Sequence, residues 1–250
     1  MVKRVSKKLI ELTDTAITSP AVQAALESKA DAGKGAFFPR FFKTGPGEYG
    51  EGDFFLGVTV PDQRAIAKQF RQLPLAEVQK LLQSKWHECR LTALLILVLQ
   101  FEPAKEKLRN ELVEFYLANL DCVNNWDLVD SSAPKILGVY SVESPKYKKH
   151  IEQLAASGHL WRERVAVLAT HAQIKRGDFR QILKLSENFL DHKHDLIHKA
   201  VGWMLREIGE IEKQTLIVFL DSYTSQMPRT MLRYAIEKLP KEKRKFYLEK

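Results

Sequence analysis

Residues 90–99 read Arg-Leu-Thr-Ala-Leu-Leu-Ile-Leu-Val-Leu, and this stretch decides the fold class. It is apolar on almost every side, which is typical of a helix buried in a protein core rather than one lying on a surface. The apolar run from Ala93 to Leu99 is far too short to cross a bilayer as a helix. We therefore expect a core helix here, and most of the chain after residue 60 also reads as helix.

The pattern in this stretch, a basic residue shortly before an alanine in an apolar helix, recurs along the chain. It is found at Arg90 with Ala93, Arg164 with Ala166, Lys199 with Ala200, and Arg233 with Ala235. With Ala133 counted as the second member, the alanines are 40, 33, 34 and 35 positions apart. Any all-helical protein can place alanines at rough intervals, but the accompanying basic residues favour stacked helical hairpins. The sequence predicts an all-α, right-handed α-solenoid of HEAT-like repeats with a concave basic groove.

The repeats are expected over residues 61–250 of a single domain that spans residues 1–250. Residues 1–60 do not share the pattern, and we expect a helical cap and loop there, with Phe37–Phe42 as a core or capping patch that covers the open end of the first repeat. Pro61 reads as a first-turn proline of a helix that extends through Phe70, and later helices are expected to start at prolines 74, 103, 145, 228 and 240. Strand signals are weak except at Phe54–Val60.

The net charge of the chain is +8, with 39 basic and 31 acidic residues. Residues 1–125 contribute +2 and residues 126–250 contribute +6, which favours an anionic partner such as nucleic acid, although a solvated surface can carry the same surplus. Cys89 and Cys122 lie in different apolar segments, which fits reduced thiols in a cytosolic protein. The charged start, Met1–Lys8, does not resemble a signal peptide.

Trp126 and Asp130 carry the strongest chemical signal. They lie four residues apart in Asn-Asn-Trp-Asp-Leu-Val-Asp (124–130), so a helix would place them on one face. An indole beside a carboxylate suits a cation better than it suits a core. Asp127 is explained as a first-turn acid that stabilises the helix dipole. The structural alternative for Asp130 is an ion pair with a basic residue of a neighbouring repeat.

Two other motifs resemble known sites but are not expected to function as such. Gly45-Pro-Gly47-Glu-Tyr-Gly50 matches a dinucleotide fingerprint, yet no helix opens from it and acidic residues surround it, so a surface loop is expected. His194 and His198 have a zinc-like spacing but lack the metalloprotease glutamate, and a solvated helix start is the better interpretation. We expect neither a metal nor another cofactor.

Three segments together resemble the bacterial alkylpurine DNA glycosylases built from HEAT-like repeats, the AlkD family. They are Trp-Asp-Leu-Val-Asp (126–130), Trp-Arg-Glu-Arg-Val-Ala-Val-Leu (161–168) and His-Lys-Ala-Val-Gly-Trp-Met-Leu-Arg-Glu (198–207). Gly-Asp-Phe-Phe-Leu-Gly-Val (52–58), with Pro61 and Arg64, also resembles a loop of the wider family. The resemblance spans roughly residues 35–240.

The resemblance implies that Asp130 is the catalytic carboxylate and that Trp126 and Trp203 are aromatic walls around the sugar of the lesion. It also implies that Arg164 contacts the DNA backbone, although Arg164 can instead pair with an acid and Trp203 can be a core residue. The glycine at 202 would leave room for something to approach Trp203. The expected DNA-binding residues are Arg164, Lys199, Arg206, Arg90 and Arg233.

The implied activity is excision of cationic N3- and N7-alkylated purines from duplex DNA. One carboxylate can suffice because the charged base leaves readily, and the resemblance implies that no deep base pocket is needed. A DNA-binding solenoid without catalysis and, more distantly, a protein-interaction scaffold are the alternatives. We expect a cytoplasmic, nucleoid-associated monomer.

Overall fold

The computed structural model describes residues 17–250, so the charged Met1–Lys8 segment lies outside the described residues. The described chain is helical, with only an isolated bridge between Phe54 and Trp86. The helices of the first half are α1 (Ser19–Glu27), α2 (Ala32–Phe41), α3 (Val60–Gln69), α4 (Leu75–Leu82), α5 (His87–Phe101), α6 (Glu106–Ala118), η1 (Leu120–Cys122) and α7 (Trp126–Ser132). Those of the second half are η2 (Pro134–Gly138), α8 (Val139–Glu143), α9 (Pro145–Ala155), α10 (Leu160–Ala169), α11 (His171–Ile174), α12 (Arg180–Asn188), α13 (Asp195–Ile211), α14 (Lys213–Tyr223), α15 (Arg229–Ala235) and α16 (Lys241–Glu249).

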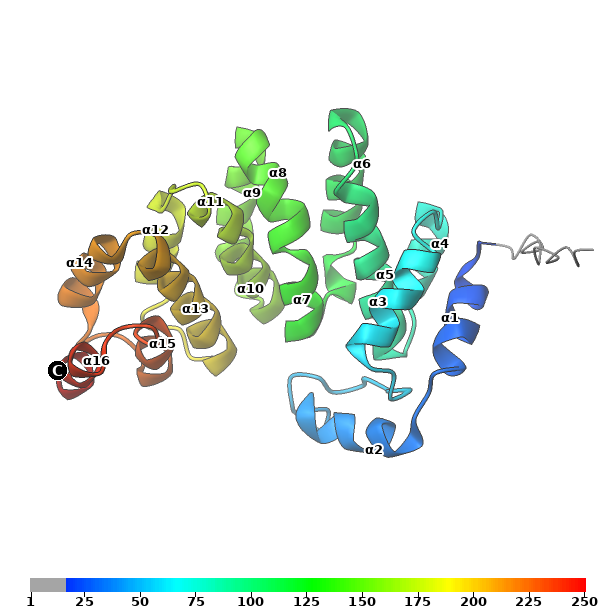
Figure 1. Ribbon diagram of the computed structural model, residues 1–250, viewed down its shortest axis with the longest axis horizontal. Coiled ribbons are helices and arrows are strands. Elements are labelled where there is room, and N and C mark those ends of the chain that lie inside the picture. Colours follow the sequence, from blue (N-terminus) through cyan, green and yellow to red (C-terminus); the bar gives the residue numbers. More distant parts are fainter. Residues whose placement is uncertain (1–16) are drawn as a thin grey trace, which may run out of the picture.

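The helices follow one another along an arc, from α1 at one end to α16 at the other (Figure 1). Helices α5, α7, α10, α13 and α15 form a row in which each packs against the next, and α4, α6, α9, α12 and α14 pack on members of this row. This arrangement confirms the predicted α-solenoid.

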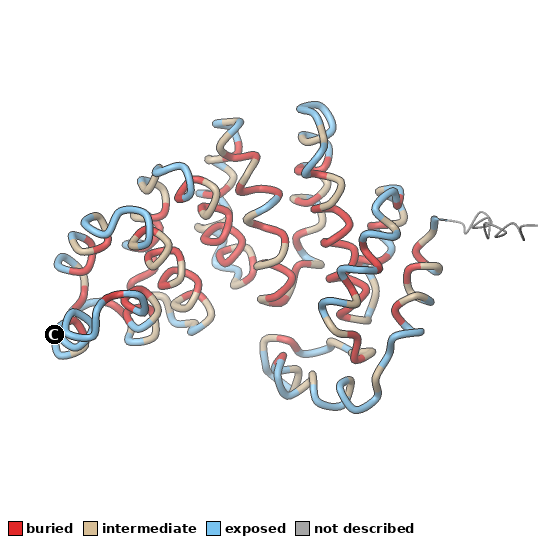
Figure 2. Tube along the Cα trace, viewed as in Figure 1, coloured by how far each residue is buried: buried red, intermediate tan, exposed pale blue. Residues whose placement is uncertain are grey.

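The repeat alanines explain how the row forms. All of them are at most 1% exposed: Ala93, Ala133, Ala166, Ala200 and Ala235. Helix α5, which carries Ala93, is buried over most of its length, as predicted. A methyl side chain leaves two neighbouring helices free to approach each other closely. The buried residues run along this row (Figure 2).

Helices α13 and α15 approach each other very closely at Gly202. A Cβ atom at this position would lie 2.5 Å from the Met231 carbonyl oxygen and 2.6 Å from the Tyr234 Cβ atom. Only a glycine therefore allows α13 and α15 to pack as they do. The room predicted beside Trp203 is filled by α15.

Proline marks several helix starts, as the sequence indicates. Pro61 lies in the first turn of α3, and Pro145 opens α9. Pro74, Pro228 and Pro240 each immediately precede a helix, whereas α6 begins at Glu106, three residues after Pro103. Proline suits these positions because the first backbone amides of a helix have no partner within it.

The N-terminal segment corrects one prediction. The outer end of the solenoid is covered by α1, whose Val22 and Leu26 are fully buried, and α1 packs on α3, α4 and α5. The Phe37–Phe42 patch belongs instead to α2, which lies on the inner side of the arc, below α3 and α7 (Figure 1). None of the residues within α2 is buried, so this helix is supported only along one side.

The segment between Phe54 and Val60 is extended but forms no strand. Its backbone amides at Leu56, Gly57 and Val58 donate to the buried carboxylate of Glu88, at 3.0, 2.8 and 3.3 Å. Glu88 on α5 thus satisfies three consecutive amides of a segment that lacks a partner strand. No helix in the described part of the chain has the length and hydropathy of a transmembrane segment.

Candidate active site

The short helix α7 carries the strongest candidates. Asn125 caps it by accepting a hydrogen bond from the backbone amide of Trp126 at 2.8 Å. Trp126 and Asp130 follow on the same face, and both are partly exposed. Immediately after α7, Pro134–Gly138 forms a π-helical turn, an element that often occurs at functional sites. The structure therefore confirms that the two residues share a face.

Asp130 forms an ion pair with Arg164 of α10. This is the alternative role considered for Asp130, a pair with a basic residue of a neighbouring repeat. Its carboxylate accepts two hydrogen bonds from the guanidinium, at 2.9 Å from Nε and 2.8 Å from Nη2. The third nitrogen of the guanidinium donates to the carbonyl oxygen of Leu196. The Arg164 side chain is 6% exposed and that of Asp130 is 19% exposed. The pair fixes the carboxylate without removing it from the surface.

Burial and the ion pair act on the pKa of Asp130 in opposite directions. Burial raises the pKa of this carboxyl group because it penalises the charged form, and the guanidinium of Arg164 lowers it. The net direction is a pKa above the ordinary value of an aspartate. Asp130 is thus a carboxylate whose ionisation depends on one neighbouring cation.

Asp130 lies between two hollows. The first, which we call the cationic hollow, has a volume of about 550 Å³ and is lined by Asp130, Lys135, His171, Lys175, Arg176 and Trp203, among others. The second, the aromatic hollow, has a volume of about 410 Å³ and is lined by Phe38, Phe41, Phe42, Phe55, Trp126 and Asp130, among others. Both volumes fall within the range of about 300–1,000 Å³ typical of ligand sites.

In the cationic hollow, the indole of Trp203 is fixed by Glu207. Its Nε1 donates to a Glu207 carboxylate oxygen at 2.9 Å, and Lys175 donates to the other oxygen at 2.7 Å. Trp203 is only partly buried, so it is not a simple core residue. His171 lies 3.6 Å from the same carboxylate, and burial lowers its pKa. Glu207 therefore orients the aromatic side chain that shares this hollow with Asp130.

Lys135 and Arg176 supply cations that the hollow does not neutralise. Within residues 17–250, neither forms an ion pair, and both are exposed. Lys135 lies on the π-helical turn five residues after Asp130 and lines both hollows. These two side chains are better placed to meet an anionic ligand than the arginine that is bound to Asp130.

In the aromatic hollow, Trp126 packs against phenylalanines of the N-terminal segment. Its ring lies parallel to that of Phe42, with centroids 5.4 Å apart and an interplanar angle of 15°. The Phe41 ring meets the indole edge to face, with centroids 5.6 Å apart. The Phe55 ring stacks on the Phe42 ring, with centroids 5.0 Å apart. The phenylalanines that were predicted to cover the end of the solenoid thus line the candidate site instead.

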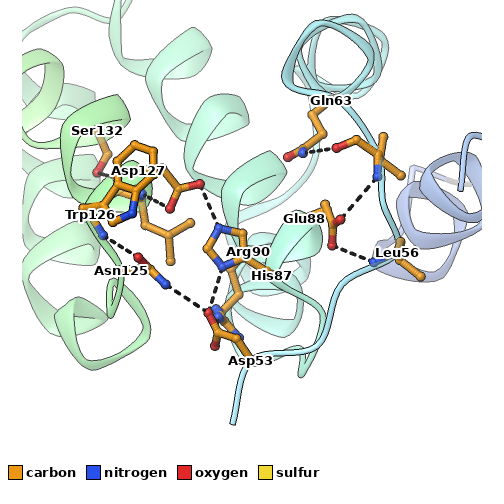
Figure 3. Close-up of polar contacts among 12 residues, drawn as sticks. Asp53, Leu56, Gln63, His87, Glu88, Arg90, Asn125, Trp126, Asp127 and Ser132 are labelled. Atoms are coloured by element: carbon orange, nitrogen blue, oxygen red, sulfur yellow. Dashed lines mark hydrogen bonds and ion pairs between the residues drawn. The ribbon is translucent and has the colours of Figure 1, made fainter. Parts of the chain in front are cut away.

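A buried ionic network lies beside the aromatic hollow (Figure 3). His87 of α5 is held at 2.8 Å by Asp53 on one ring nitrogen and at 2.8 Å by Asp127 on the other. Arg90 also binds Asp53. Burial lowers the pKa of His87, but the two carboxylates outweigh burial and raise it to about 9. The network ties the loop before Phe54 to the first turn of α7, so Asp127 does more than stabilise a helix dipole.

The structure does not place the predicted DNA contacts on one surface. Arg90 and Arg164 are buried and paired, which corrects their predicted positions, and Lys199 pairs with Asp195 at 2.7 Å. Arg206 pairs with Glu237, while Arg233 is exposed. The difference follows the available partners: carboxylates accept from Arg90 and Arg164, whereas no ion pair within residues 17–250 involves Arg233.

The glycine-rich loop and the histidine pair agree with their structural interpretations. The loop at 45–50 is closed by its own acids, since Glu48 accepts from the Gly45 amide and Glu51 from the Gly47 amide. His194 caps α13 by accepting from the amide of Leu196 at 3.1 Å. Within the described residues, no group of three or more His, Cys, Asp or Glu side chains is arranged to hold a metal ion.

Sequence reasoning missed Lys135, Arg176 and the phenylalanines that face Trp126. Lys135 follows Asp130 by five residues, but only the π-helical turn after α7 brings it beside both hollows. The contact between Phe42 and Trp126 joins segments 84 positions apart, and no local periodicity reports such a contact.

Comparisons with known proteins agree with the fold. The family model described as DNA alkylation repair enzyme matches residues 22–239. A solved structure described as a predicted DNA alkylation repair enzyme from Enterococcus faecalis is similar, with a TM-score of 0.66 and 16% sequence identity. The similarity covers 85% of this chain and 98% of that chain. No curated protein matches the chain.

Proposed function

Because this chain belongs to the DNA alkylation repair enzyme family, we propose that it is a monofunctional DNA glycosylase. Its substrates are cationic N3- and N7-alkylated purines in duplex DNA, such as 3-methyladenine and 7-methylguanine. One observation carries the proposal: Asp130 is a partly exposed carboxylate between two hollows, with Trp126 in one and Trp203 in the other. A residue that served only the core would not line both.

The chemistry needs few groups. Water adds to C1′ of the deoxyribose, and the electron pair of the C1′–N bond leaves with the base, which becomes neutral. The proton lost by the water passes to Asp130 and then to solvent. As the bond breaks, positive charge develops on the sugar, and a fixed carboxylate stabilises it by about 3–4 kcal/mol, in analogy with other preorganised groups. The leaving group needs no second acid because it already carries a charge.

The aromatic side chains support the same transition state. Each indole face near a cation contributes about 0.5–2 kcal/mol. Trp203 is held in place by Glu207, and Trp126 by Phe42. Arg164 then acts as a positioning residue for Asp130 rather than as a DNA contact. Lys135 and Arg176 take over the contact with the DNA backbone.

The ion pair between Asp130 and Arg164 favours a second candidate, a DNA-binding solenoid without catalysis. A carboxylate that accepts two hydrogen bonds from a buried guanidinium can serve stability alone. The two candidates share the exposed cations and differ in whether Asp130 meets the sugar.

The deciding experiment is incubation of the protein with methylated duplex DNA, followed by chromatography of the released bases. The glycosylase proposal expects free 3-methyladenine and 7-methylguanine in amounts that grow with enzyme and time. Binding of the DNA without any released base would reject the glycosylase proposal in favour of a DNA-binding solenoid without catalysis.

A further inference from the structure

We propose that His87 is a positioning residue for the candidate active site. Its charged imidazole joins the loop that precedes Phe54 to α7, the helix that carries Trp126 and Asp130 (Figure 3). This role rests on the proposed glycosylase function, because His87 acts on excision only through the two side chains of α7.

The contacts of the imidazole require it to be charged. Its Nδ1 lies 2.8 Å from a carboxylate oxygen of Asp53, and its Nε2 lies 2.8 Å from a carboxylate oxygen of Asp127. An ionised carboxylate only accepts hydrogen bonds, so both ring nitrogens must donate, which only the imidazolium can do. Arg90 also binds Asp53, so the cluster holds two cations and two anions. Buried charges need such pairing, and His87 is only 2% exposed.

The cluster holds α7 on both sides of Trp126. Asp127, the residue after Trp126, binds His87 directly. Asn125, the residue before it, caps the helix and donates from Nδ2 to Asp53 at 3.4 Å. Because α7 has only seven residues, a fixed first turn also sets the direction of Asp130, which lies about one turn further along.

Aromatic contacts provide a second connection between His87 and Trp126. The imidazole faces the ring of Phe42, with centroids 4.7 Å apart, and that of Phe55, with centroids 5.0 Å apart. The Phe42 ring in turn lies parallel to the Trp126 indole. A cation is attracted to the face of an aromatic ring, so the charged imidazole also stabilises the surface on which the indole rests.

The other charged groups near the imidazole do not replace this connection. Four of them line the aromatic hollow together with His87: Arg64, Glu88, Asp130 and Lys135. Glu88 is bound by backbone amides, and Asp130 by Arg164. Arg64 and Lys135 are exposed. Among the described residues, Asp53 and Asp127 are the carboxylates that form ion pairs with the imidazole.

Loss of the imidazole proton should release one side of the cluster. A neutral imidazole donates from one nitrogen only, so one of the two carboxylates would then face an acceptor. The carboxylates outweigh burial and raise the pKa of His87 to about 9. The connection is therefore complete at lower pH and is lost as the pH rises through this pKa. Excision should accordingly show an alkaline limb in its pH–rate profile.

The first test measures single-turnover release of 3-methyladenine from methylated duplex DNA between about pH 7 and about pH 10, corrected for release without protein. The wild-type rate should fall with a midpoint near the pKa of His87. Asp53→Asn removes one carboxylate that favours the imidazolium, so the midpoint should move to lower pH. Asp178→Asn is the matched control, since Asp178 forms an ion pair with Lys148 and lines neither hollow. This control should leave the midpoint unchanged.

The second test needs no variant and follows the wild-type protein by NMR as the pH rises. The His87 imidazole and the Trp126 indole N–H should titrate with the same midpoint, because release of Asp127 alters the first turn of α7. The Trp203 indole N–H, which donates to Glu207, should not follow this midpoint and serves as the internal control.

A third test separates positioning from substrate binding. His87→Gln should lower the single-turnover rate by up to about 10²-fold, the cost of misplacing a reacting group, while the affinity for DNA stays nearly unchanged. Equal losses of rate and affinity would contradict a positioning role.

The possible outcomes distinguish this role from the glycosylase function. Base release without an alkaline limb, or with a limb that Asp53→Asn does not move, overturns the role of His87 and leaves the glycosylase function intact. A Trp126 indole that does not follow the titration of His87 overturns it as well. No base release at any pH overturns the glycosylase function instead, and a shared NMR midpoint would still show that His87 holds α7.

Discussion

The two hollows beside Asp130 are built from different parts of the chain. The cationic hollow is formed by the repeats, with Lys135 on the π-helical turn, Arg176 after α11 and Trp203 on α13. One wall of the aromatic hollow comes from α2 and the extended segment after Phe54, which precede the repeats. The solenoid thus supplies charge and the catalytic candidate, whereas the N-terminal segment supplies the phenylalanines of the apolar surface.

Asp130 belongs to both hollows, so its loss should have the largest effect. We expect Asp130→Asn to lower the rate of base release about 10²- to 10³-fold, because the neutral amide cannot stabilise a cationic sugar. DNA binding should remain nearly unchanged. The measurement is single-turnover release of 3-methyladenine, with Asp121→Asn as the control because Asp121 is 80% exposed on the surface. Full activity of Asp130→Asn would refute the catalytic assignment.

The ion pair with Arg164 allows a test of how Asp130 is held. In the proposed mechanism ionised Asp130 is the active form, so activity should fall as the pH drops through the pKa of this group. In wild type the guanidinium of Arg164 lowers that pKa against the effect of burial. Arg164→Met removes the cation, so the pKa should rise and the acid limb of the pH–rate profile should move to higher pH. An unmoved limb would show that this pair does not control the reacting carboxylate.

The tryptophans compare the hollows directly. Trp126→Ala should remove the indole of the aromatic hollow, and Trp203→Ala that of the cationic one. Each change should lower the excision rate by about 2- to 30-fold, the effect of losing one cation–π contact. Melting temperatures of both variants provide the control. A large fall in melting temperature together with a small loss of rate would show that the tryptophan serves packing rather than excision.

The smallest expected effect concerns a cation of the surface. Lys135→Met should reduce the dependence of log affinity on log salt concentration by about 0.9, which corresponds to one lost phosphate contact. Arg164→Lys should leave this slope unchanged because Arg164 is buried against Asp130. Lys107→Met, at an exposed position of α6 that lines neither hollow, is the matched control. A slope that responds to Arg164 and not to Lys135 would reverse this assignment.

Much of the fold could be predicted from the sequence because it depends on short-range patterns. The spaced alanines predict the row of helices, and Pro61 and Pro145 mark helix starts that the structure contains. The shared face of Trp126 and Asp130 follows from helical geometry alone. These features need no knowledge of distant contacts.

The parts that the sequence did not predict depend on distant contacts or on direction. Phe42 reaches Trp126 only because α2 folds back to the inner side of the arc. Arg90 and Arg164 follow the repeat but turn into the interior, where carboxylates bind them. A count of basic residues cannot show which way each one points, and the exposed Lys135 and Arg176 lie outside the repeating pattern.

The position of α2 has a consequence for the evolution of this protein. This helix contributes to the site but none of its residues is buried, so substitutions there disturb the core little. The Asp130 carboxylate, by contrast, is anchored between two neighbouring repeats through α7 and α10. Substitutions on one peripheral helix can therefore reshape a wall of the aromatic hollow while the anchoring of Asp130 stays intact.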